Sequence, residues 1–576
     1  MRKFRLIVLV LCVFSSCTKP QKLNLVDPQP GRTLESYQAA AKSAMIASPN
    51  PQASQIGLEV LKKGGNAVDA AIAVSFALSV LRPQSTGLGG GGFLLFYDKE
   101  KNKTVAIDFR EVAPLAAHRD MYLRDDKADT KLSQDGALAV AVPRLVAGLG
   151  YLYDNYAGGK ISWVDLIQPA INLAEQGFKI YPRLAEAIQQ RKEVLTAFPS
   201  SKKIFFGKEG PLREGEAFVQ KDLAKTLTEI AKQGWQVFYH GGISWSIVNT
   251  VRRHGGILDL KDFYHVKIHK MKPVTGTYRD YKIVSMPPPS SGGAVLIEIL
   301  NILEEFPLRR RGPYNARTAH VITEAMRRGF MDRAVYLGDA RFVKVPVRGI
   351  TSKEYAKSLA ASISLKKATP SNSLAPQHGT LNESDSTTHF SIVDQAGNAA
   401  ASTQTINTLF GSGLAAEGTG IVLNNEMDDF SVQAGVPNSF GLIGSEANAI
   451  APGKVPLSSM SPTFVFDSDG RLFLVLGSPG GPKIITAVLN TILNMIDFKA
   501  TPLQAVAAKR MHHQWLPDQL MVEPGLYPEE VVEKLTQMGH AVEETPNASL
   551  VMLVARTKEG WVGVADPRGA GVPMGY

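Results

Sequence analysis

The sequence predicts an α+β fold in which β-sheets are sandwiched between helices. Four segments have a strand-turn-strand pattern, and several of their strands are continuous apolar runs, such as Leu472 to Leu476, which indicates burial on both faces. Several helical patterns are long enough to cover such sheets. With 576 residues, 44% of them hydrophobic and only 2 cysteines, the chain has the composition of a large globular protein and not of a disordered, collagen-like or disulfide-stapled one.

The clearest predicted helix begins after Asn66, because Asp69 three residues later completes a capping-box pattern. The segment is apolar almost all round through Leu81 and stops before Pro83, so this helix must be buried on most sides. Further helical patterns lie near residues 163–176, 292–304, 316–336 and 484–497.

The four predicted hairpins each join two strand-like runs through a turn rich in Gly, Asp, Asn, Lys or Glu. They run from Phe93 to Phe109, from His389 to Thr405, from Thr463 to Leu476 and from Leu550 to Ala565.

The first 17 residues have the order of a secretory signal: basic residues, the apolar run Leu6 to Phe14, then small residues ending in Cys17. Nine apolar residues cannot span a bilayer, which needs about 20 in a helix. Cys17 is placed as in a bacterial lipobox, with Phe14 where Leu or Val is usual. We expect an exported, periplasmic protein with a lipid anchor at Cys17, or alternatively an ordinary cleaved signal, and a polar tether over residues 18–39.

The chain changes character at residues 366–386, a stretch rich in Lys, Ser, Pro, Asn and Asp that runs directly into an apolar strand. Residues 387–576 hold 10 Lys and Arg against 18 Asp and Glu, a net charge of −8, which leaves +18 for residues 1–386. Opposite charges favour association of the two blocks. The stretch is an inter-domain linker or a processing site.

The sequence lacks the motifs of zinc, P-loop and serine-hydrolase sites, so we expect no metal and no cofactor. Gly87 to Gly92 contains Gly-x-Gly-x-x-Gly, but the run precedes a strand, and we interpret it as close backbone packing. The adjacent His512 and His513 favour structural packing over metal binding. The densest basic cluster, Arg309 to Arg311, is interpreted as a solvated turn, and no basic stripe with aromatic platforms indicates a nucleic-acid partner.

The remaining candidate chemistry is that of a hydroxyl nucleophile, located where the polar stretch meets the strand. A threonine hydroxyl is a weak nucleophile, but a threonine at a chain N-terminus carries its own base in the free α-amine, whose pKa is about 8. Cleavage between Ser386 and Thr387 would create such a residue. Taken alone, two threonines that open a strand equally fit ordinary β-propensity.

The block Thr387 to Asp394 (TTHFSIVD) resembles the start of the small subunit of γ-glutamyltranspeptidases, N-terminal-nucleophile enzymes that cut themselves into two subunits. Six other blocks resemble family blocks in family order, and the similarity covers about residue 40 to the C-terminus. These blocks are 108–111, 286–293, 424–430, 456–462, 477–481 and 566–568. The resemblance implies a four-layer αββα sandwich, built jointly by a large subunit (40–386) and a small catalytic subunit (387–576).

The resemblance also assigns roles for catalysis. Thr387 corresponds to the nucleophile, and the hydroxyl of Thr405 to the group that hydrogen-bonds it. Gly480 and Gly481 correspond to backbone donors for the oxyanion, where the absence of a Cβ allows close approach.

Further roles follow for substrate binding. Arg110 corresponds to the residue that binds the substrate α-carboxylate by a planar fork, assisted by the hydroxyls of Ser458 and Ser459. Asn407, Glu426 and Asp429 match the residues that receive the α-ammonium group. Residues 431–450 match a lid loop in which Phe440 replaces a tyrosine of many bacterial members and loses its hydroxyl.

The implied activity is that of a γ-glutamyltransferase and glutathione hydrolase, which passes a γ-glutamyl group from Thr387 to water, an amino acid or a dipeptide without a cofactor. Two alternatives within the enzyme class are a cephalosporin (glutaryl) acylase and a poly-γ-glutamate-processing relative. A third is an uncut, non-catalytic surface lipoprotein that binds γ-glutamyl compounds.

Overall fold

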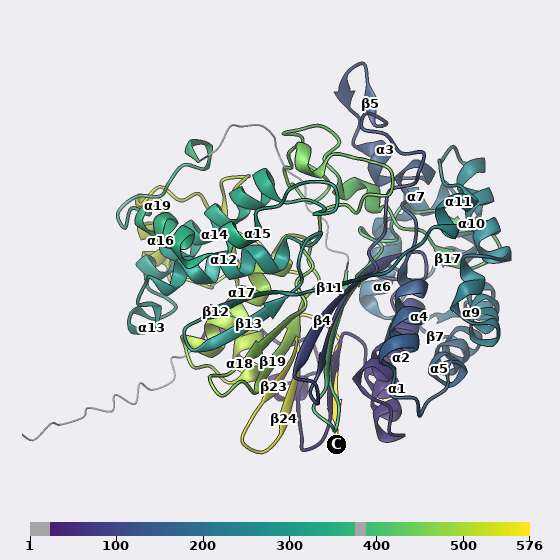
Figure 1. The fold of residues 1–576 in the computed structure, drawn as a ribbon, viewed down its shortest axis with the longest axis horizontal. Coiled ribbons are helices and arrows are strands. Elements are labelled where there is room, and N and C mark those ends of the chain that lie inside the picture. The colour runs from purple at the N-terminus through teal and green to yellow at the C-terminus, as the bar shows by residue number, and fades with distance from the viewer. Residues whose placement is uncertain (1–22, 375–386) are drawn as a thin grey trace, which may run out of the picture.

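A computed structural model describes residues 23–374 and 387–576. Cys17, the signal-like segment and Ser386 lie outside the described residues. Two seven-stranded antiparallel sheets pack against one another, and helices cover both outer faces (Figure 1). The predicted arrangement of sheets between helices is confirmed.

The first sheet unites strands from both sides of the Ser386–Thr387 junction. Its order is β11 (His269–Met271), β4 (Lys103–Asp108), β3 (Gly91–Asp98), β15 (Ala399–Thr405), β14 (Thr388–Val393), β2 (Met45–Ser48) and β25 (Val572–Gly575). The central pairing joins β3 to β15, with Phe93 opposite Thr403 and Gly91 opposite Thr405. This register brings the end of β15 next to the glycine-rich start of β3.

The second sheet mixes the same two parts of the chain. Its order is β1 (Gln38–Ala41), β24 (Trp561–Ala565), β23 (Met552–Arg556), β19 (Leu472–Gly477), β18 (Thr463–Phe466), β13 (Tyr281–Ser285) and β12 (Val274–Tyr278). The four predicted hairpins are the pairs β3/β4, β14/β15, β18/β19 and β23/β24, so all four are confirmed.

The apolar strand runs are explained by a core between the two sheets. Phe93, Leu95 and Tyr97 of β3 pack there with Val475 of β19 and Met552 of β23. The other faces of these strands pack on helices, so both faces are buried.

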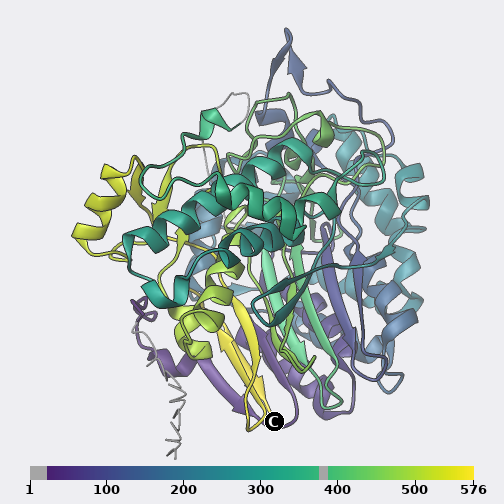
Figure 2. The ribbon, with the colours of Figure 1, turned by 60° about the vertical axis from the view of Figure 1, so that its left-hand side comes forward.

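Helices form two separate outer layers (Figures 1 and 2). On the first sheet lie α1 (Pro51–Lys62), α2 (Ala67–Leu81) and α4 (Leu145–Tyr156), while α5 (Trp163–Gln176) packs on α2 and α9 (Lys221–Gln233) packs on α5. On the second lie α12 (Gly292–Glu304) and α17 (Lys483–Ile496), and α14 (Ala316–Tyr336) packs on α12. All five predicted helices are confirmed within one residue, and α2 starts at the expected Asn66–Asp69 capping box.

Smaller helices complete the described chain. They are α3 (Lys131–Gln134), α6 (Pro182–Gln190), α7 (Lys192–Thr196), α8 (Pro199–Phe205), α10 (Gly242–Arg253), α11 (Leu260–Tyr264), α13 (Leu308–Arg311), α15 (Val347–Ile350), α16 (Lys353–Ala361), α18 (Pro502–Ala507) and α19 (Glu529–Gln537). Short strands pair outside the two main sheets: β5 (Leu123–Arg124) with β6 (Lys127–Ala128), β7 (Phe178–Lys179) with β10 (Ala217–Phe218), β8 (Phe206–Gly207) with β9 (Gly210–Pro211), β16 (Ala415–Ala416) with β17 (Ile421–Val422), and β21 (Leu520–Val522) with β20 (Met511–His512) and β22 (Val542–Glu544). None of the helices in the described ranges is long and apolar enough to cross a bilayer.

One expectation about local structure is wrong, and a second is right only in part. The described part of the predicted tether is docked, because Leu23 is buried in the core of the second sheet, the backbone N–H of Val26 donates to Ala507, and residues 38–41 form the edge strand β1. The cluster Arg309 to Arg311 belongs to the short helix α13 and not to a turn, but Arg309 and Arg310 are exposed, so the expected solvation is confirmed. In both places one or a few buried apolar residues, such as Leu23 and Leu308, fix a segment whose composition is mainly polar.

Candidate active site

Two threonine hydroxyls meet where β14 and β15 lie side by side. The Oγ1 atoms of Thr387 and Thr405 are hydrogen-bonded at 3.3 Å. Thr387 immediately precedes β14 and is 6% exposed, while Thr405 is the last residue of β15. The Oγ1 of Thr405 also accepts a hydrogen bond from the backbone N–H of Asn407 at 2.8 Å, which fixes its orientation.

The glycine run before β3 supports this corner by close packing, as predicted. A Cβ on Gly90 would lie 2.2 Å from the carbonyl oxygen of Thr405, and one on Gly92 would lie 2.4 Å from that of Thr403. Any side chain at these positions would push β15 away. The glycines therefore set the position of Thr405 and not a nucleotide site.

Arg110, which follows β4, lies at the centre of a buried charge cluster. Its guanidinium pairs with Glu426 at 2.7 Å and with Asp429, and its Nε donates to the carbonyl of Pro456 at 3.0 Å. Burial by itself would lower the pKa of Arg110, but the two carboxylates outweigh it and raise the pKa above its ordinary value. Arg110 is therefore a fixed cation in the pocket.

The acidic side of the cluster comes from one short turn, η5 (Glu426–Asp429). Burial raises the pKa of Glu426 and of Asp429, while Arg110 lowers both. Asn407 lies beside this turn with φ +77° and donates through Nδ2 to the carbonyl of Asn425 at 3.0 Å. Asparagine is among the non-glycine residues that tolerate this left-handed backbone best.

Ser458 and Ser459 present hydroxyls on the other wall. The backbone of Ser458 is held by Ser291, whose N–H and Oγ both donate to its carbonyl at 2.7 and 2.6 Å. The Oγ of Ser459 is buried and has no partner among the described residues. An unpaired buried hydroxyl costs free energy, so this group is available to a bound ligand.

Gly480 and Gly481 follow β19 and both have positive φ, +126° and +52°. A Cβ on Gly481 would lie 2.6 Å from the ring of Phe440, so the predicted lid residue covers this turn directly. Both positions therefore favour glycine, because a positive φ is unfavourable for residues with a side chain. At Gly481 a Cβ would also collide with Phe440.

The segment that carries Phe440 closes the site. The backbone N–H of Ser439 donates to Asp428 at 2.9 Å, and Asn438 donates to Asp429 at 3.1 Å. The remaining space among these side chains is about 20 Å³, which is room for about one water molecule. The pocket is therefore closed over its polar side chains.

All ten predicted catalytic and binding residues in the described chain gather at this corner. Nine of them line one pocket, together with Phe440: Arg110, Thr387, Thr405, Asn407, Glu426, Asp429, Ser458, Ser459 and Gly481. Gly480 adjoins Gly481, and Ser386 lies outside the described residues. The roles assigned to them stay predictions.

Two charged neighbours were missed by sequence reasoning. Arg333, from the last turn of α14, lines the pocket, and its Nε donates to Ser291 Oγ at 3.0 Å. Glu111 is completely buried behind Arg110, and burial raises its pKa to about 8. The only sequence signal for Glu111 is its place in the block 108–111, and Arg333 sits in a helix with no motif.

One other cluster in the described residues has the geometry of a metal site: His320, Glu324 and His540. Its ligand atoms are already engaged, since the two imidazoles bond to one another at 2.7 Å and Glu324 pairs with Arg327 and Arg328. Two arginines beside the carboxylate oppose a cation. The cluster fits a structural hydrogen-bond network better than a metal centre.

The arrangement suits acyl transfer from an amino-acid derivative. A hydroxyl pair lies beside a glycine turn that can present backbone N–H groups to an oxyanion. Fixed positive and negative groups stand close together in the same pocket, as an α-carboxylate and an α-ammonium group would require.

Comparison with known proteins agrees with this geometry. Residues 53–576 match the family model described as "Gamma-glutamyltranspeptidase". The chain is 45% identical to the "Glutathione hydrolase proenzyme" of Escherichia coli (strain K12), over 92% of this chain and 91% of that protein. It is 42% identical to the protein of the same name from Pseudomonas sp. (strain A14), over 93% and 95%.

Solved structures show the same likeness. The cephalosporin acylase from Bacillus halodurans superposes with a TM-score of 0.82 at 27% identity, covering 96% of this chain and 99% of that one. The Helicobacter pylori γ-glutamyltranspeptidase is 43% identical with a TM-score of 0.57, covering 59% of this chain and 97% of that one. On these matches and on the site they accompany, the chain belongs to the γ-glutamyltranspeptidase family.

Proposed function

We propose that this protein is a glutathione hydrolase and γ-glutamyltransferase with Thr387 as its nucleophile. The observation that carries the proposal is the hydrogen-bonded pair Thr387–Thr405 on the wall of a pocket that also holds Arg110 and Asp429. The names of the relatives in Escherichia coli and Pseudomonas support the same activity.

Maturation would come first. The hydroxyl of Thr387 attacks the carbonyl carbon of Ser386, the C–N bond between the two residues breaks, and the freed nitrogen takes up the hydroxyl proton. Water then opens the resulting ester, which leaves a carboxylate on Ser386 and a free amine beside the Thr387 hydroxyl.

Turnover would repeat this chemistry on the donor. The Thr387 hydroxyl attacks the γ-carbonyl, its proton passes through the α-amine to the leaving nitrogen, and a γ-glutamyl ester forms. Water or an acceptor amine then attacks the ester and returns a proton to the Thr387 oxygen. Backbone N–H groups at Gly480 and Gly481 would stabilise the oxyanion; loss of such a donor costs about 3–4 kcal/mol in other acyl-transfer enzymes.

The proposed mature protein is a heterodimer of a large subunit, residues 40–386, and a small subunit, residues 387–576. Together they would form the four-layer αββα sandwich of N-terminal-nucleophile hydrolases. The mixing of strands from both parts in each sheet supports this assembly.

Cleavage and activity test the proposal together. Purified protein should give a fragment of 190 residues that begins at Thr387, and it should release p-nitroaniline from γ-glutamyl-p-nitroanilide. Thr387→Ala should stay uncut and inactive, whereas Thr388→Ala, the same change one residue later, should be cut. An uncut wild-type chain that still turns over the donor would refute the mechanism.

Glutaryl-cephalosporin and poly-γ-glutamate should be poor substrates in the same assay. A glutaryl group has no ammonium, so it would leave Glu426 and Asp429 without the positive partner that an amino-acid head supplies. Turnover of either compound in place of the nitroanilide would reject the assignment of substrate.

We further propose export to the periplasm, with a lipid on Cys17. The support is the charged, apolar and small-residue order of residues 1–17. Palmitate labelling of the wild type, lost in Cys17→Ser, is the expected result, and an unlabelled wild type would leave an ordinary signal peptide.

A further inference from the structure

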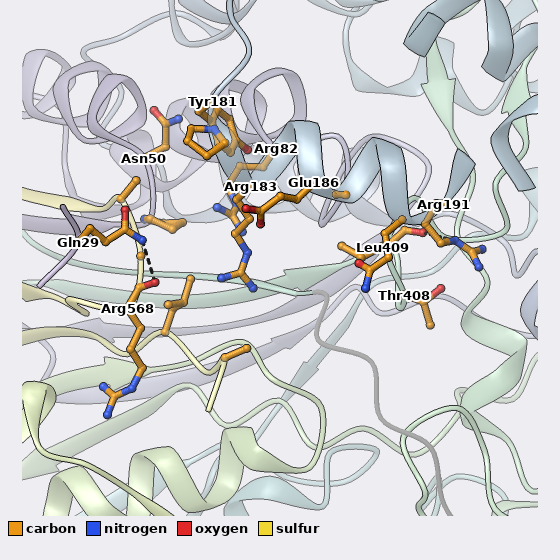
Figure 3. A pocket seen from close by; sticks show the side chains of 18 of the residues that line it. Gln29, Asn50, Arg82, Tyr181, Arg183, Glu186, Arg191, Thr408, Leu409 and Arg568 are labelled. Atoms are coloured by element: carbon orange, nitrogen blue, oxygen red, sulfur yellow. Dashed lines mark hydrogen bonds between the residues drawn. The ribbon is translucent and has the colours of Figure 1, made fainter. Parts of the chain in front are cut away.

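A groove of about 1160 Å³ adjoins the active site, and Figure 3 shows Arg82 and Arg183 close together in it. Ser439 lines this groove, while its chain neighbour Phe440 lines the active-site pocket, so the groove belongs to the surroundings of that site. A second basic surface lies elsewhere, around α13, and the reaction proposed above does not use it.

The surface around α13 lies at the lower left of Figure 1. We call it the α13 face and define it by its basic residues: Arg309, Arg310 and Arg311 of α13, Arg317 in the first turn of α14, and Lys499 just after α17. All of them except Arg311 are exposed. Partial burial and the nearby Arg309 lower the pKa of Lys499, so cations from separate segments meet on this face.

The positive charge of the α13 face is only partly offset. Arg309 is held at the end of α17, where its Nη2 donates to the carbonyl of Ile496 at 3.1 Å. The other four cations form no ion pair within the described ranges. The exposed carboxylates of Asp280 and Glu305 lie beside them, and the acidic first turn of α19, which packs on α14, borders the face. The face itself therefore keeps a net positive charge.

The described chain begins beside this face. Leu23 is buried next to Pro313 and Tyr314, which lie just after α13. The backbone N–H of Asn24 donates to the hydroxyl of Tyr314. The start of the described chain is therefore fixed at the end of α13.

The distance along the chain from this point to Cys17 is short. Cys17, the residue proposed to carry a lipid, precedes Leu23 by six positions. A chain of that length spans at most about 20 Å. A lipid on Cys17 would therefore hold the α13 face within about 20 Å of the bilayer surface, and Lys19 and Lys22 add two cations between them.

We propose that the α13 face docks on a membrane surface that carries anionic phospholipids. The inference deepens the lipid anchor proposed above and is independent of the proposed catalytic activity. Guanidinium groups bind phosphate oxygens in planar, bidentate geometry. Basic residues are attracted to an anionic lipid surface within a screening length of about 8–10 Å. A single acyl chain holds a protein only marginally, and a basic patch is one of the second signals that make anchoring stable.

Helix α14 shows how docking would place the active site. Arg317 lies in its first turn and Arg333, which lines the active-site pocket, in its last. At a rise of 1.5 Å per residue, the two are about 24 Å apart along the helix axis. Docking would therefore leave the pocket clear of the lipid, and substitutions on the α13 face should not change turnover.

Vesicle binding by full-length Cys17→Ser, which cannot carry the lipid, tests the face itself. This parent should prefer vesicles of equal parts phosphatidylglycerol and phosphatidylcholine to vesicles of phosphatidylcholine alone. Arg310→Gln combined with Arg317→Gln should lower the preference about tenfold, because each basic residue near an anionic surface adds to the attraction. Arg310→Lys with Arg317→Lys should retain it, since the charge is kept.

The matched control is Lys208→Gln with Arg213→Gln, an equal loss of charge at exposed residues between α8 and α9. The control should keep the preference of the parent. No preference in the parent, or an equal preference in the parent and in the α13 double Gln variant, would overturn the proposal.

Salt gives a test that needs no change on the face. In about 1 M NaCl, where the screening length is about 3 Å, the parent should lose most of its preference for phosphatidylglycerol. A preference unchanged by salt would overturn the proposal even if the double Gln variant does not fold. A wild type that takes up no palmitate, or releases no p-nitroaniline, would refute the proposals made above without altering the vesicle result, so these failures can be told apart.

Discussion

At the scale of single residues, the pocket is a balance of buried charges. Arg110 is held by Glu426 and Asp429, and Arg333 adds a second guanidinium whose pKa burial lowers to about 10. A substrate with both an α-carboxylate and an α-ammonium group can enter by exchanging partners within this set. A ligand with only one charge would leave a buried group uncompensated.

Glu111 makes this balance dependent on pH. Its carboxyl group faces Arg110, Glu426 and Arg144, and burial raises its pKa from 4.5 to about 8. A carboxyl group with a raised pKa binds its proton more tightly in the folded state, so its stabilising contribution is complete below pH 4.5 and is lost as the pH rises through about 8.

Glu111→Gln should therefore become more stable relative to wild type as the pH rises from 5 to 9. We expect its melting temperature to gain on the order of 1 °C for each unit by which the pKa is raised. Melting curves at several pH values measure this, with the exposed Glu100→Gln as control. Parallel pH profiles of wild type and Glu111→Gln would contradict the prediction.

At the scale of elements, the segment predicted to be a lid covers the pocket. Its tip is tied by Ser439 to Asp428 and by Asn438 to Asp429, while a short bridge joins Pro437 to Ile443. Phe440 packs on Gly481, and Leu442 and Ile443 of the same segment pack on the core beside the second sheet. Substrate entry requires this segment to move, because the space left in the pocket is about 20 Å³.

The elements also show what sequence can predict. Helix α2 and the hairpin β14/β15 were predicted because their signals are local: a capping box, a period of apolar residues and a turn. The pairing of β3 with β15 joins residues about 300 positions apart, and periodicity carries no information on such a partner. The tether was misjudged because Leu23 and Leu25 are too few to make a pattern.

The residues of the candidate site likewise include some that local sequence signals predict and some that they do not. Thr387, Arg110 and Asp429 were predicted as site residues because each lies in a short block that resembles a family block. Their residue types alone fit other roles equally well. Arg333 was missed, since an arginine in a helix is usually solvated or ion-paired, and only the packing of α14 against Ser291 brings it to the pocket.

At the scale of the whole molecule, the two parts of the chain cannot be separated as layers. Residues 23–374 supply β3 and β13, and residues 387–576 supply their neighbours β15 and β18. The core between the sheets also takes side chains from both parts. The opposite net charges of the two blocks therefore add to an interface that is mainly backbone hydrogen bonds and apolar contact.

This interleaving predicts how the cleaved protein responds to salt. If charge held the subunits together, about 1 M NaCl, where the screening length falls to about 3 Å, would separate them. We expect the 190-residue fragment to co-elute with its partner in size-exclusion chromatography at low and at high salt, at the volume of uncut Thr387→Ala. Salt weakens Coulomb attraction but not apolar burial, so release of the smaller fragment in NaCl would show that the shared sheets do not hold the assembly.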